Sequence, residues 1–211
     1  MHSPLRVELP RVLVATNGSG EPRVPAAFAE AQFARDLDLA TLVAIAGSAR
    51  PPVALDIDAV QGLNPDGAAV RFVIEELGIG IVATHRPSIA AAVAERGGLG
   101  LLHVLAFDST GLGRVLDSRP DRPGIGTMIS PGPVLGHLLP ADLERLPRPV
   151  VAYGLIGTAE LARSLLLRAD AVALSSRCAQ ELVAWPGWDP SGAPVRGASG
   201  VPTRRARPEA S

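Results

Sequence analysis

Short runs of apolar residues alternate along the chain with longer segments in which apolar residues recur at helical spacing. The runs are continuous and rich in Val, Leu and Ile, which predicts buried strands of a parallel sheet. We expect eight strands, at residues 12–15, 42–45, 53–57, 79–83, 101–105, 125–129, 150–153 and 171–174. Helical spacing occurs at residues 25–36, 67–77, 88–96, 134–146 and 158–168.

Regular alternation of strand and helix predicts an α/β fold, a small TIM-like (β/α)8 barrel. One connection conflicts with this pattern, because only residues 46–52 separate the second predicted strand from the third, and Pro51 and Pro52 are among them. A parallel crossover needs about a dozen residues. Either the second βα unit is shortened, or residues 42–45 are not a barrel strand.

The composition changes after Trp185. Residues 186–211 are rich in Pro, Gly, Ser, Ala and Arg and contain almost nothing to bury, which is typical of a disordered tail. We therefore divide the chain into an N-terminal extension (1–10), a barrel domain (11–185) and a disordered C-terminal tail (186–211). The tail arginines either contact RNA or an acidic partner or are simply solvated.

The loops that follow the last two predicted strands have a pattern typical of phosphate sites. Gly154 follows one strand and Ser175 with Ser176 follows the other, and a helical segment comes next in both places. Glycine lets backbone N–H groups approach a phosphate, and a helix N-terminus adds donors and a favourable dipole. Alternatively, Gly154 serves a tight turn and Thr158 caps the next helix.

Further polar residues stand at the ends of other predicted strands, where parallel barrels carry their functional groups. They are Asn17, Asp56, Asp58, Thr84, His85, His103, Asp108 and Ser130. On a strand, Asp56 and Asp58 would face the same side and could share a proton or a divalent ion; alternatively, one of them pairs with an arginine inside the barrel. No histidine spacing suggests a metal site.

Charge and composition narrow the function further. The 20 basic and 21 acidic residues give no overall field toward a polyanion, which argues mildly against nucleic-acid binding. Every basic residue is arginine, so Schiff-base chemistry is excluded. The single Cys178 cannot form an internal disulfide, and we expect it to be buried and inert. Without a signal peptide or an apolar run of about 18 residues, we expect a cytoplasmic protein that does not span a membrane.

Five motifs in order along the chain carry a family resemblance. They are Asp-Ile-Asp-Ala-Val-Gln-Gly-Leu from Asp56, Phe-Asp-Ser from Phe107, Ser-Pro-Gly from Ser130, Gly-Leu-Ile from Gly154 and Ala-Val-Ala-Leu-Ser-Ser from Ala171. In this order and spacing the chain resembles the glycerol-3-phosphate-responsive antiterminators, regulators of glycerol uptake operons, over about residues 12–176.

The resemblance implies a TIM-like barrel without known catalysis or cofactor. Such a protein would bind glycerol 3-phosphate or a related phosphorylated small molecule and act on leader mRNA to prevent premature termination. For the chain itself we expect no membrane partner, and a homo-oligomer stays open. Five residues match the family's phosphate-binding positions: Gly154, Leu155, Ile156, Ser175 and Ser176. For the polar part of the mouth we expect Asp58, Thr84, His103 and Asp108.

The chain also departs from the family pattern. The family usually has His where Asp56 stands, Arg at His103, Glu at Thr127, Gly at Tyr153 and a basic residue at Gly157. Because charge-assisted hydrogen bonds to phosphate are about twice as strong as neutral ones, the two lost basic positions predict weaker anion binding or a changed ligand. The alternatives to a regulator are a TIM-barrel enzyme acting on a small phosphosugar, with Asp56 or Asp58 as acid or base, and a degenerate non-catalytic barrel.

Overall fold

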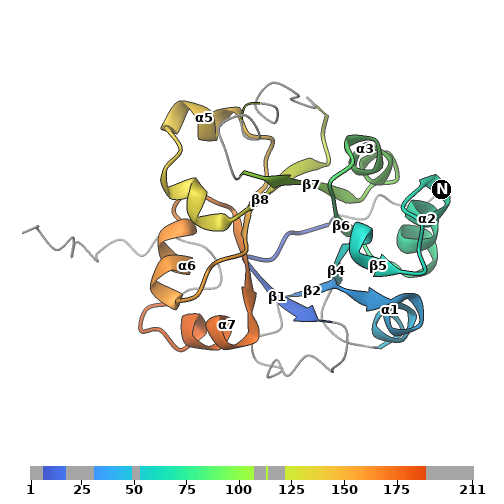
Figure 1. Ribbon diagram of the computed structural model, residues 1–211, viewed down its shortest axis with the longest axis horizontal. Helices are drawn as coiled ribbons and strands as arrows, with labels where there is room; N and C mark the ends of the chain where they lie inside the picture. The colour runs from blue at the N-terminus through green and yellow to red at the C-terminus, as the bar shows by residue number, and fades with distance from the viewer. Residues whose placement is uncertain (1–6, 18–30, 49–52, 107–112, 114–121, 189–211) are drawn as a thin grey trace, which may run out of the picture.

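The computed structural model describes residues 7–17, 31–48, 53–106, 113 and 122–188. Eight parallel strands form a closed barrel in the order β1-β10-β9-β8-β7-β6-β4-β2. Helices surround the ring of strands (Figure 1). The predicted TIM-like α/β barrel is therefore confirmed.

The first strand closes the ring. On β1, Leu13 lies opposite Ala173 of β10 on one side and opposite Ala31 of β2 on the other. The barrel strands are β1 (Val12–Asn17), β2 (Ala31–Arg35), β4 (Val53–Asp56), β6 (Ile81–Thr84), β7 (Leu99–Leu105), β8 (Ile125–Ser130), β9 (Val150–Tyr153) and β10 (Ala171–Ser175). Two short strands, β3 (Leu37–Asp38) and β5 (Val60–Gln61), pair separately.

Helices and helical turns connect the strands. They are α1 (Leu39–Ala46), η2 (Ile57–Ala59), α2 (Gly67–Arg71), the π-helical turn η3 (Phe72–Glu76), α3 (Pro87–Glu95), η4 (Gly132–Gly136), α5 (Pro140–Arg145), α6 (Ala159–Leu165) and α7 (Ser176–Val183). Side-chain caps begin several of them: Asp38, Asp66, Thr158 and Ser175 each accept a hydrogen bond from a backbone N–H in the first turn. In the part of the chain that the structure describes, no helix is long and apolar enough to cross a lipid bilayer.

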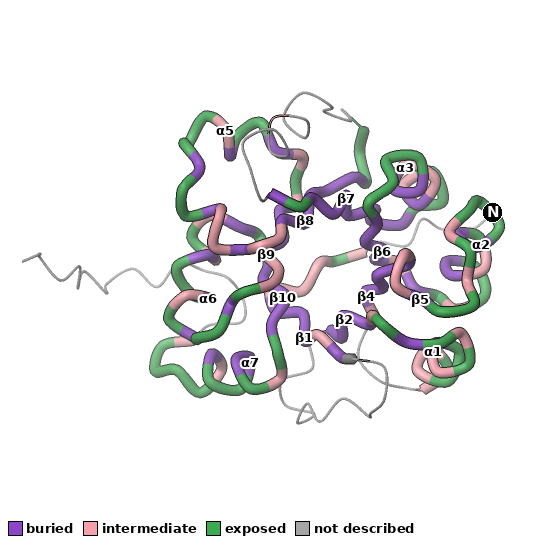
Figure 2. The backbone as a smooth tube through the Cα atoms, in the orientation of Figure 1, coloured by how far each residue is buried: buried purple, intermediate pink, exposed green. Residues whose placement is uncertain are grey.

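Alternate residues of each strand face the barrel interior, where they form one apolar cluster that includes Phe33, Leu101 and Met128. Val7 and Leu9, which precede β1, pack against this inner cluster. The other strand faces pack against the helices in two outer clusters. Figure 2 shows the result, with buried strands at the centre and exposed helix surfaces outside.

The second βα unit differs from the prediction. Residues 42–45 are not a strand but lie within α1, and the second barrel strand is β2, which was expected to be helical. The second βα unit therefore contains a helix, α1, and is not shortened. The eight residues of α1 are all apolar except Thr41, so they resemble a buried strand, whereas its helical start is set by the Asp38 cap. Residues 25–30 of the expected helix lie outside the described residues.

The helix expected over residues 134–146 is broken into η4 and α5. The break precedes Pro140, because the ring of a proline disfavours helical backbone in the residue before it. Leu139 accordingly has an extended backbone, with ψ at 149°.

Packing contacts reach beyond both ends of the expected barrel domain. Val7 and Leu9, in the expected N-terminal extension, pack against the inner cluster. At the other end, Trp188 packs against an outer cluster, and the guanidinium of Arg11 lies 5.9 Å from the centre of its ring. Structured chain thus continues past residue 185; residues 189–211 of the expected tail lie outside the described residues.

Close packing between α3 and β7 makes a glycine necessary at position 100. A Cβ atom there would collide with the backbone carbonyl of Ala90, whereas a Cβ at Gly67, in the first turn of α2, would meet nothing within 4 Å. We predict that Gly100→Ala destabilises the protein by about 1–3 kcal/mol, while Gly67→Ala is neutral or stabilising by up to about 1 kcal/mol. Urea unfolding of both variants measures this, and equal midpoints would contradict the packing described.

Candidate functional site

The carboxyl ends of the eight strands meet at one mouth of the barrel. On each strand the residue two positions beyond an inner-cluster residue points the same way, into the mouth. This alternation assigns to the mouth Arg35, Asp56, His103, Ser130, Tyr153 and Ser175. The mouth is therefore lined by polar and titratable groups above an apolar interior.

One side of the mouth contains a cavity of about 660 Å³ beside β9, β10 and β1. All the residues predicted to bind phosphate line it: Gly154, Leu155, Ile156, Ser175 and Ser176. Other described residues also line the cavity: Ala15, Tyr153, Gly157, Ala173 and Leu174. Two loops that are separate in sequence thus contribute to a single cavity, as the strand-end argument predicts.

The backbone conformation of the loop after β9 requires glycine. Gly154 has φ of +73°, and a Cβ there would lie 3.0 Å from Ser130 Oγ. Leu155 also has positive φ, at 55°, and its side chain is exposed, while Ile156 turns inward and is buried. The Gly132 N–H donates to the Gly154 carbonyl at 3.0 Å, which ties the loop to the start of η4.

Helix starts adjoin the cavity. Thr158 caps α6, with the Leu161 N–H donating to its hydroxyl at 3.2 Å, so the capping role considered for Thr158 is confirmed. Ser175 caps α7, where the Cys178 N–H donates to its Oγ at 3.4 Å. The first N–H groups of a helix have no carbonyl partner within it, and the helix dipole there favours an anion. Ser176, the first residue of α7, lines the cavity.

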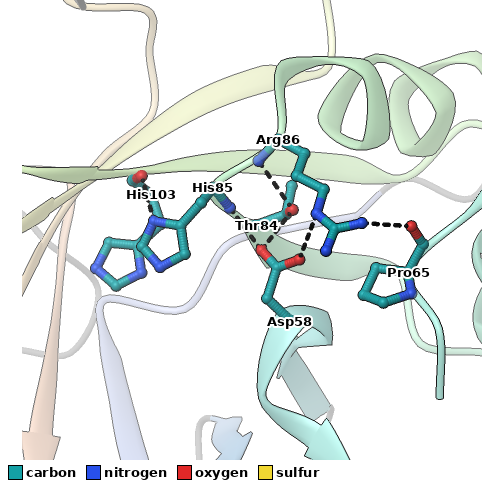
Figure 3. Close-up of polar contacts among 6 residues, drawn as sticks. All are labelled: Asp58, Pro65, Thr84, His85, Arg86 and His103. Atoms are coloured by element: carbon teal, nitrogen blue, oxygen red, sulfur yellow. Dashed lines mark hydrogen bonds and ion pairs between the residues drawn. The ribbon is translucent and has the colours of Figure 1, made fainter.

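The opposite side of the mouth is organised by Asp58, which lies in η2 and not on a strand. Its Oδ2 accepts hydrogen bonds from Thr84 Oγ1 at 2.8 Å and from the His85 N–H at 2.7 Å, and its Oδ1 lies 3.4 Å from Arg86 Nε (Figure 3). Arg86 in turn donates to the Pro65 carbonyl at 3.0 Å. Asp58 and Thr84 therefore hold the turn between β6 and α3.

The expectation that Asp56 and Asp58 face the same side of a strand is wrong. Strand β4 ends at Asp56, and the helical turn η2 that follows breaks the alternation. The alternative of an aspartate paired with an arginine applies to Asp58 and Arg86, although this pair lies at the β6–α3 turn and not inside the barrel. Asp56 remains in the mouth, only 4% exposed, and Arg35 on the neighbouring strand β2 is the charge that acts on it most strongly.

Two histidine rings stack on each other, one from the end of β6 and one from β7. The centres of the His85 and His103 rings are 4.3 Å apart, and the ring planes meet at 22°. His85 Nδ1 donates to the His103 carbonyl at 3.0 Å, which fixes the orientation of its ring (Figure 3). Tyr153 contacts His103 edge-on, at 5.6 Å between ring centres.

Burial controls the protonation of these groups. The pKa of Asp56 is raised because burial disfavours the carboxylate, although the positive charge of Arg35 acts in the opposite direction. The pKa of His103 is lowered to about 4 by burial, with smaller contributions from His85 and Arg35. At neutral pH His103 is therefore an uncharged imidazole.

Arg35 is the residue of the site that the sequence analysis missed, because its segment was expected to be helical. Its guanidinium lies 5.4 Å from the centre of the Tyr153 ring, and its Nε lies 2.8 Å from Asp36 Oδ2. The alternation of Ala31, Phe33 and Arg35 on the inner face of β2 is the signal that could have identified it.

Two further predicted residues, Cys178 and Asp108, lie away from these contacts or outside the described residues. Cys178 is buried in α7, as expected, and burial raises the pKa of its thiol. Asp108 lies outside the described residues. Among the residues that are described, no group of three or more His, Cys, Asp or Glu side chains could hold a metal ion.

We predict that the His103 imidazole titrates at a pKa of about 4 in an NMR pH titration, because burial opposes its protonation. Replacing Arg35 by Gln removes a neighbouring positive charge and should raise this pKa. The unfolded chain protonates this histidine at its ordinary pKa of 6.5, whereas the folded chain resists protonation until about 4. Lowering the pH from 6.5 toward 4 should therefore also destabilise the fold. A His103 titration near 6.5 would contradict this description of the mouth.

Similar solved structures agree with the barrel fold. A glycerol uptake operon antiterminator-related protein from Thermotoga maritima has a TM-score of 0.70 at 21% identity, with 82% of this chain and 99% of that chain covered. A glycerol uptake operon antiterminator regulatory protein from Listeria monocytogenes gives 0.62 at 20% identity, covering 81% and 95%. A phosphoribosylanthranilate isomerase from Thermotoga maritima gives 0.57 at 14% identity, covering 83% and 97%. At these identities the likeness shows the fold alone.

The sequence itself identifies the family. None of the curated proteins matches the chain. The family model for the glycerol-3-phosphate responsive antiterminator matches residues 33–181, which is more than half of the chain. The matched residues run from β2 to α7 and contain both sides of the mouth. The chain therefore belongs to the glycerol-3-phosphate responsive antiterminator family.

Proposed function

We propose that this chain is a transcription antiterminator that binds the phosphate group of glycerol 3-phosphate, or of a related small molecule, in the cavity beside β9 and β10. One observation carries the proposal: the glycine loop after β9 and the start of α7 line the same cavity. Family membership supplies the ligand class.

Backbone groups and hydroxyls are the main phosphate ligands in this proposal. The positive φ of Gly154 lets the chain turn close to the cavity, and the start of α7 supplies N–H groups and a favourable dipole. One cation contacts the lining directly: the Arg35 guanidinium lies 5.4 Å from the centre of the Tyr153 ring. A phosphate can be held in this way without lysine.

The polar residues expected in the mouth divide into two roles. His103 faces the mouth, so we propose that it contacts the ligand. Asp58 and Thr84 hydrogen-bond to each other and to the β6–α3 turn, and in the proposal they position His85 and through it His103. For Asp108, the expected ligand role stays a prediction.

Regulation requires that the ligand bind one state of the protein more tightly than another. We propose that occupation of the mouth favours the state that binds leader mRNA in the cytoplasm, in the form of a single chain or of a homo-oligomer. The absence of lysine leaves contacts with RNA phosphates to arginine.

Isothermal titration calorimetry with glycerol 3-phosphate tests the phosphate site. Gly154→Asp should weaken binding more than about tenfold, equivalent to about 1.4 kcal/mol, because it places a negative charge beside the phosphate. Gly154→Asn is the matched control: both side chains have the same size and tolerate positive φ, and both approach Ser130 Oγ equally. The Asn variant should therefore bind more tightly than the Asp variant.

Absence of heat with the native protein at millimolar glycerol 3-phosphate would contradict the proposed ligand and would favour a barrel that has lost its ligand. Equal affinities of the Asp and Asn variants would place the phosphate elsewhere.

Binding to the leader RNA of a glycerol operon is tested by gel shift. We predict that glycerol 3-phosphate strengthens the shift and that the affinity falls with increasing salt, because arginine contacts to phosphates release counterions. A shift that is independent of both ligand and salt would argue against this part of the proposal.

An enzyme acting on a small phosphosugar is the second candidate function. The observation in its favour is that burial shifts the pKa of Asp56 upward and that of His103 downward, as in many acid–base pairs. Turnover of dihydroxyacetone phosphate that is lost in Asp56→Asn would support the enzyme. A regulator should show no turnover with this compound.

A further inference from the structure

We propose that Asp56 and His103 form a second subsite in the mouth, opposite the glycine loop, that binds the hydroxyl groups of a polyol phosphate. This inference rests on the proposed function, which places the phosphate in the cavity beside β9 and β10. It adds a chemical requirement on the other end of the ligand.

Unpartnered buried atoms point to this subsite. His103 is 7% exposed and Asp56 is 4% exposed. Asp56 Oδ1 and both ring nitrogens of His103 have no hydrogen-bond partner among the described residues. Buried polar atoms in folded proteins are nearly always hydrogen-bonded, and leaving one unpaired is costly. Three such atoms at the mouth of a barrel therefore favour a ligand that pairs with them.

The surrounding residues hold the His103 ring in place. His85 stacks on one face of the ring, and its own backbone N–H is fixed by Asp58 at 2.7 Å. The Tyr153 ring contacts the His103 ring edge-on, with 5.6 Å between the two ring centres. The imidazole is thus oriented before a ligand arrives, which lowers the entropic cost of binding.

The donor and acceptor pattern selects the class of ligand group. An uncharged imidazole offers one N–H donor and one acceptor nitrogen, and a carboxylate offers only acceptors. A diol satisfies both, because each hydroxyl donates and accepts. An ammonium group would leave the imidazole N–H unpaired.

Tyr153 connects the two subsites. It lines the phosphate cavity and also contacts His103 and Arg35. In Figure 2, β9 and β10 stand on one side of the barrel, and β4 and β6 stand on the other. A small ligand that passes over Tyr153 would therefore place its phosphate on the first side and its hydroxyl groups toward the second.

Calorimetry with three probes tests the inference: glycerol 3-phosphate, n-propyl phosphate, which has the same length but no hydroxyl groups, and inorganic phosphate. The native protein should bind glycerol 3-phosphate about tenfold or more tightly than n-propyl phosphate, because unpaired groups in a site penalise a ligand that lacks their partners. His103→Phe and Asp56→Leu should each reduce this preference to about threefold or less without weakening n-propyl phosphate binding. His137→Phe, which replaces an exposed histidine in the turn after η4, should retain it.

The outcomes separate the two proposals. Equal binding of glycerol 3-phosphate and n-propyl phosphate by the native protein would overturn the hydroxyl subsite while the phosphate site stands. Binding of none of the probes would overturn both. If the variants fail to fold, NMR of the native protein decides: glycerol 3-phosphate, but not n-propyl phosphate, should shift the His103 ring resonances, and equal shifts would overturn the subsite.

Discussion

Closure of the sheet through β1 is the constraint on which the site depends. This strand pairs with β10 through Val12 and Val172 and with β2 through Leu13 and Ala31, so neither end of the sheet is left as an edge. Because all strands in the ring are parallel, closure brings their carboxyl ends to one mouth. It also places β9 and β10, with the glycine loop, across from β4, β6 and β7, with the titratable side chains. An open sheet of the same sequence would hold these two sets of residues far apart.

The two sides of the mouth use different physical means. On the side of β9 and β10, backbone conformation and helix starts create a cavity, and none of the described residues that line it is charged. On the opposite side, Asp58 fixes the turn that carries His85, and burial keeps His103 uncharged. In the proposals above, the helix dipole and N–H groups on one side serve the phosphate, and the buried polar side chains on the other side serve hydroxyl groups. Such a site needs no lysine.

Much of this arrangement could be predicted from the sequence, and the failures have physical reasons. Continuous aliphatic runs identified most barrel strands, because a strand that is buried on both faces is apolar at every position and not only at alternate positions. The same property led to a wrong prediction at α1, where an almost wholly apolar helix resembles a strand. At β2 the Ala residues favoured a predicted helix, but pairing with neighbouring strands makes the segment a strand. The error at β2 concealed Arg35. The loop residues Gly154 and Ser175 were found because strand ends in a barrel converge whatever the details of each unit.

The separation of Asp56 from Asp58 could not be predicted, because it depends on a single helical turn directly after β4.

A crystal structure with glycerol 3-phosphate tests the central claim most directly. The account predicts the phosphate beside Gly154 and the start of α7, with the hydroxyl groups within hydrogen-bond distance of Asp56 and His103. A phosphate bound on the Asp56 side, or a ligand bound outside the mouth, would contradict it.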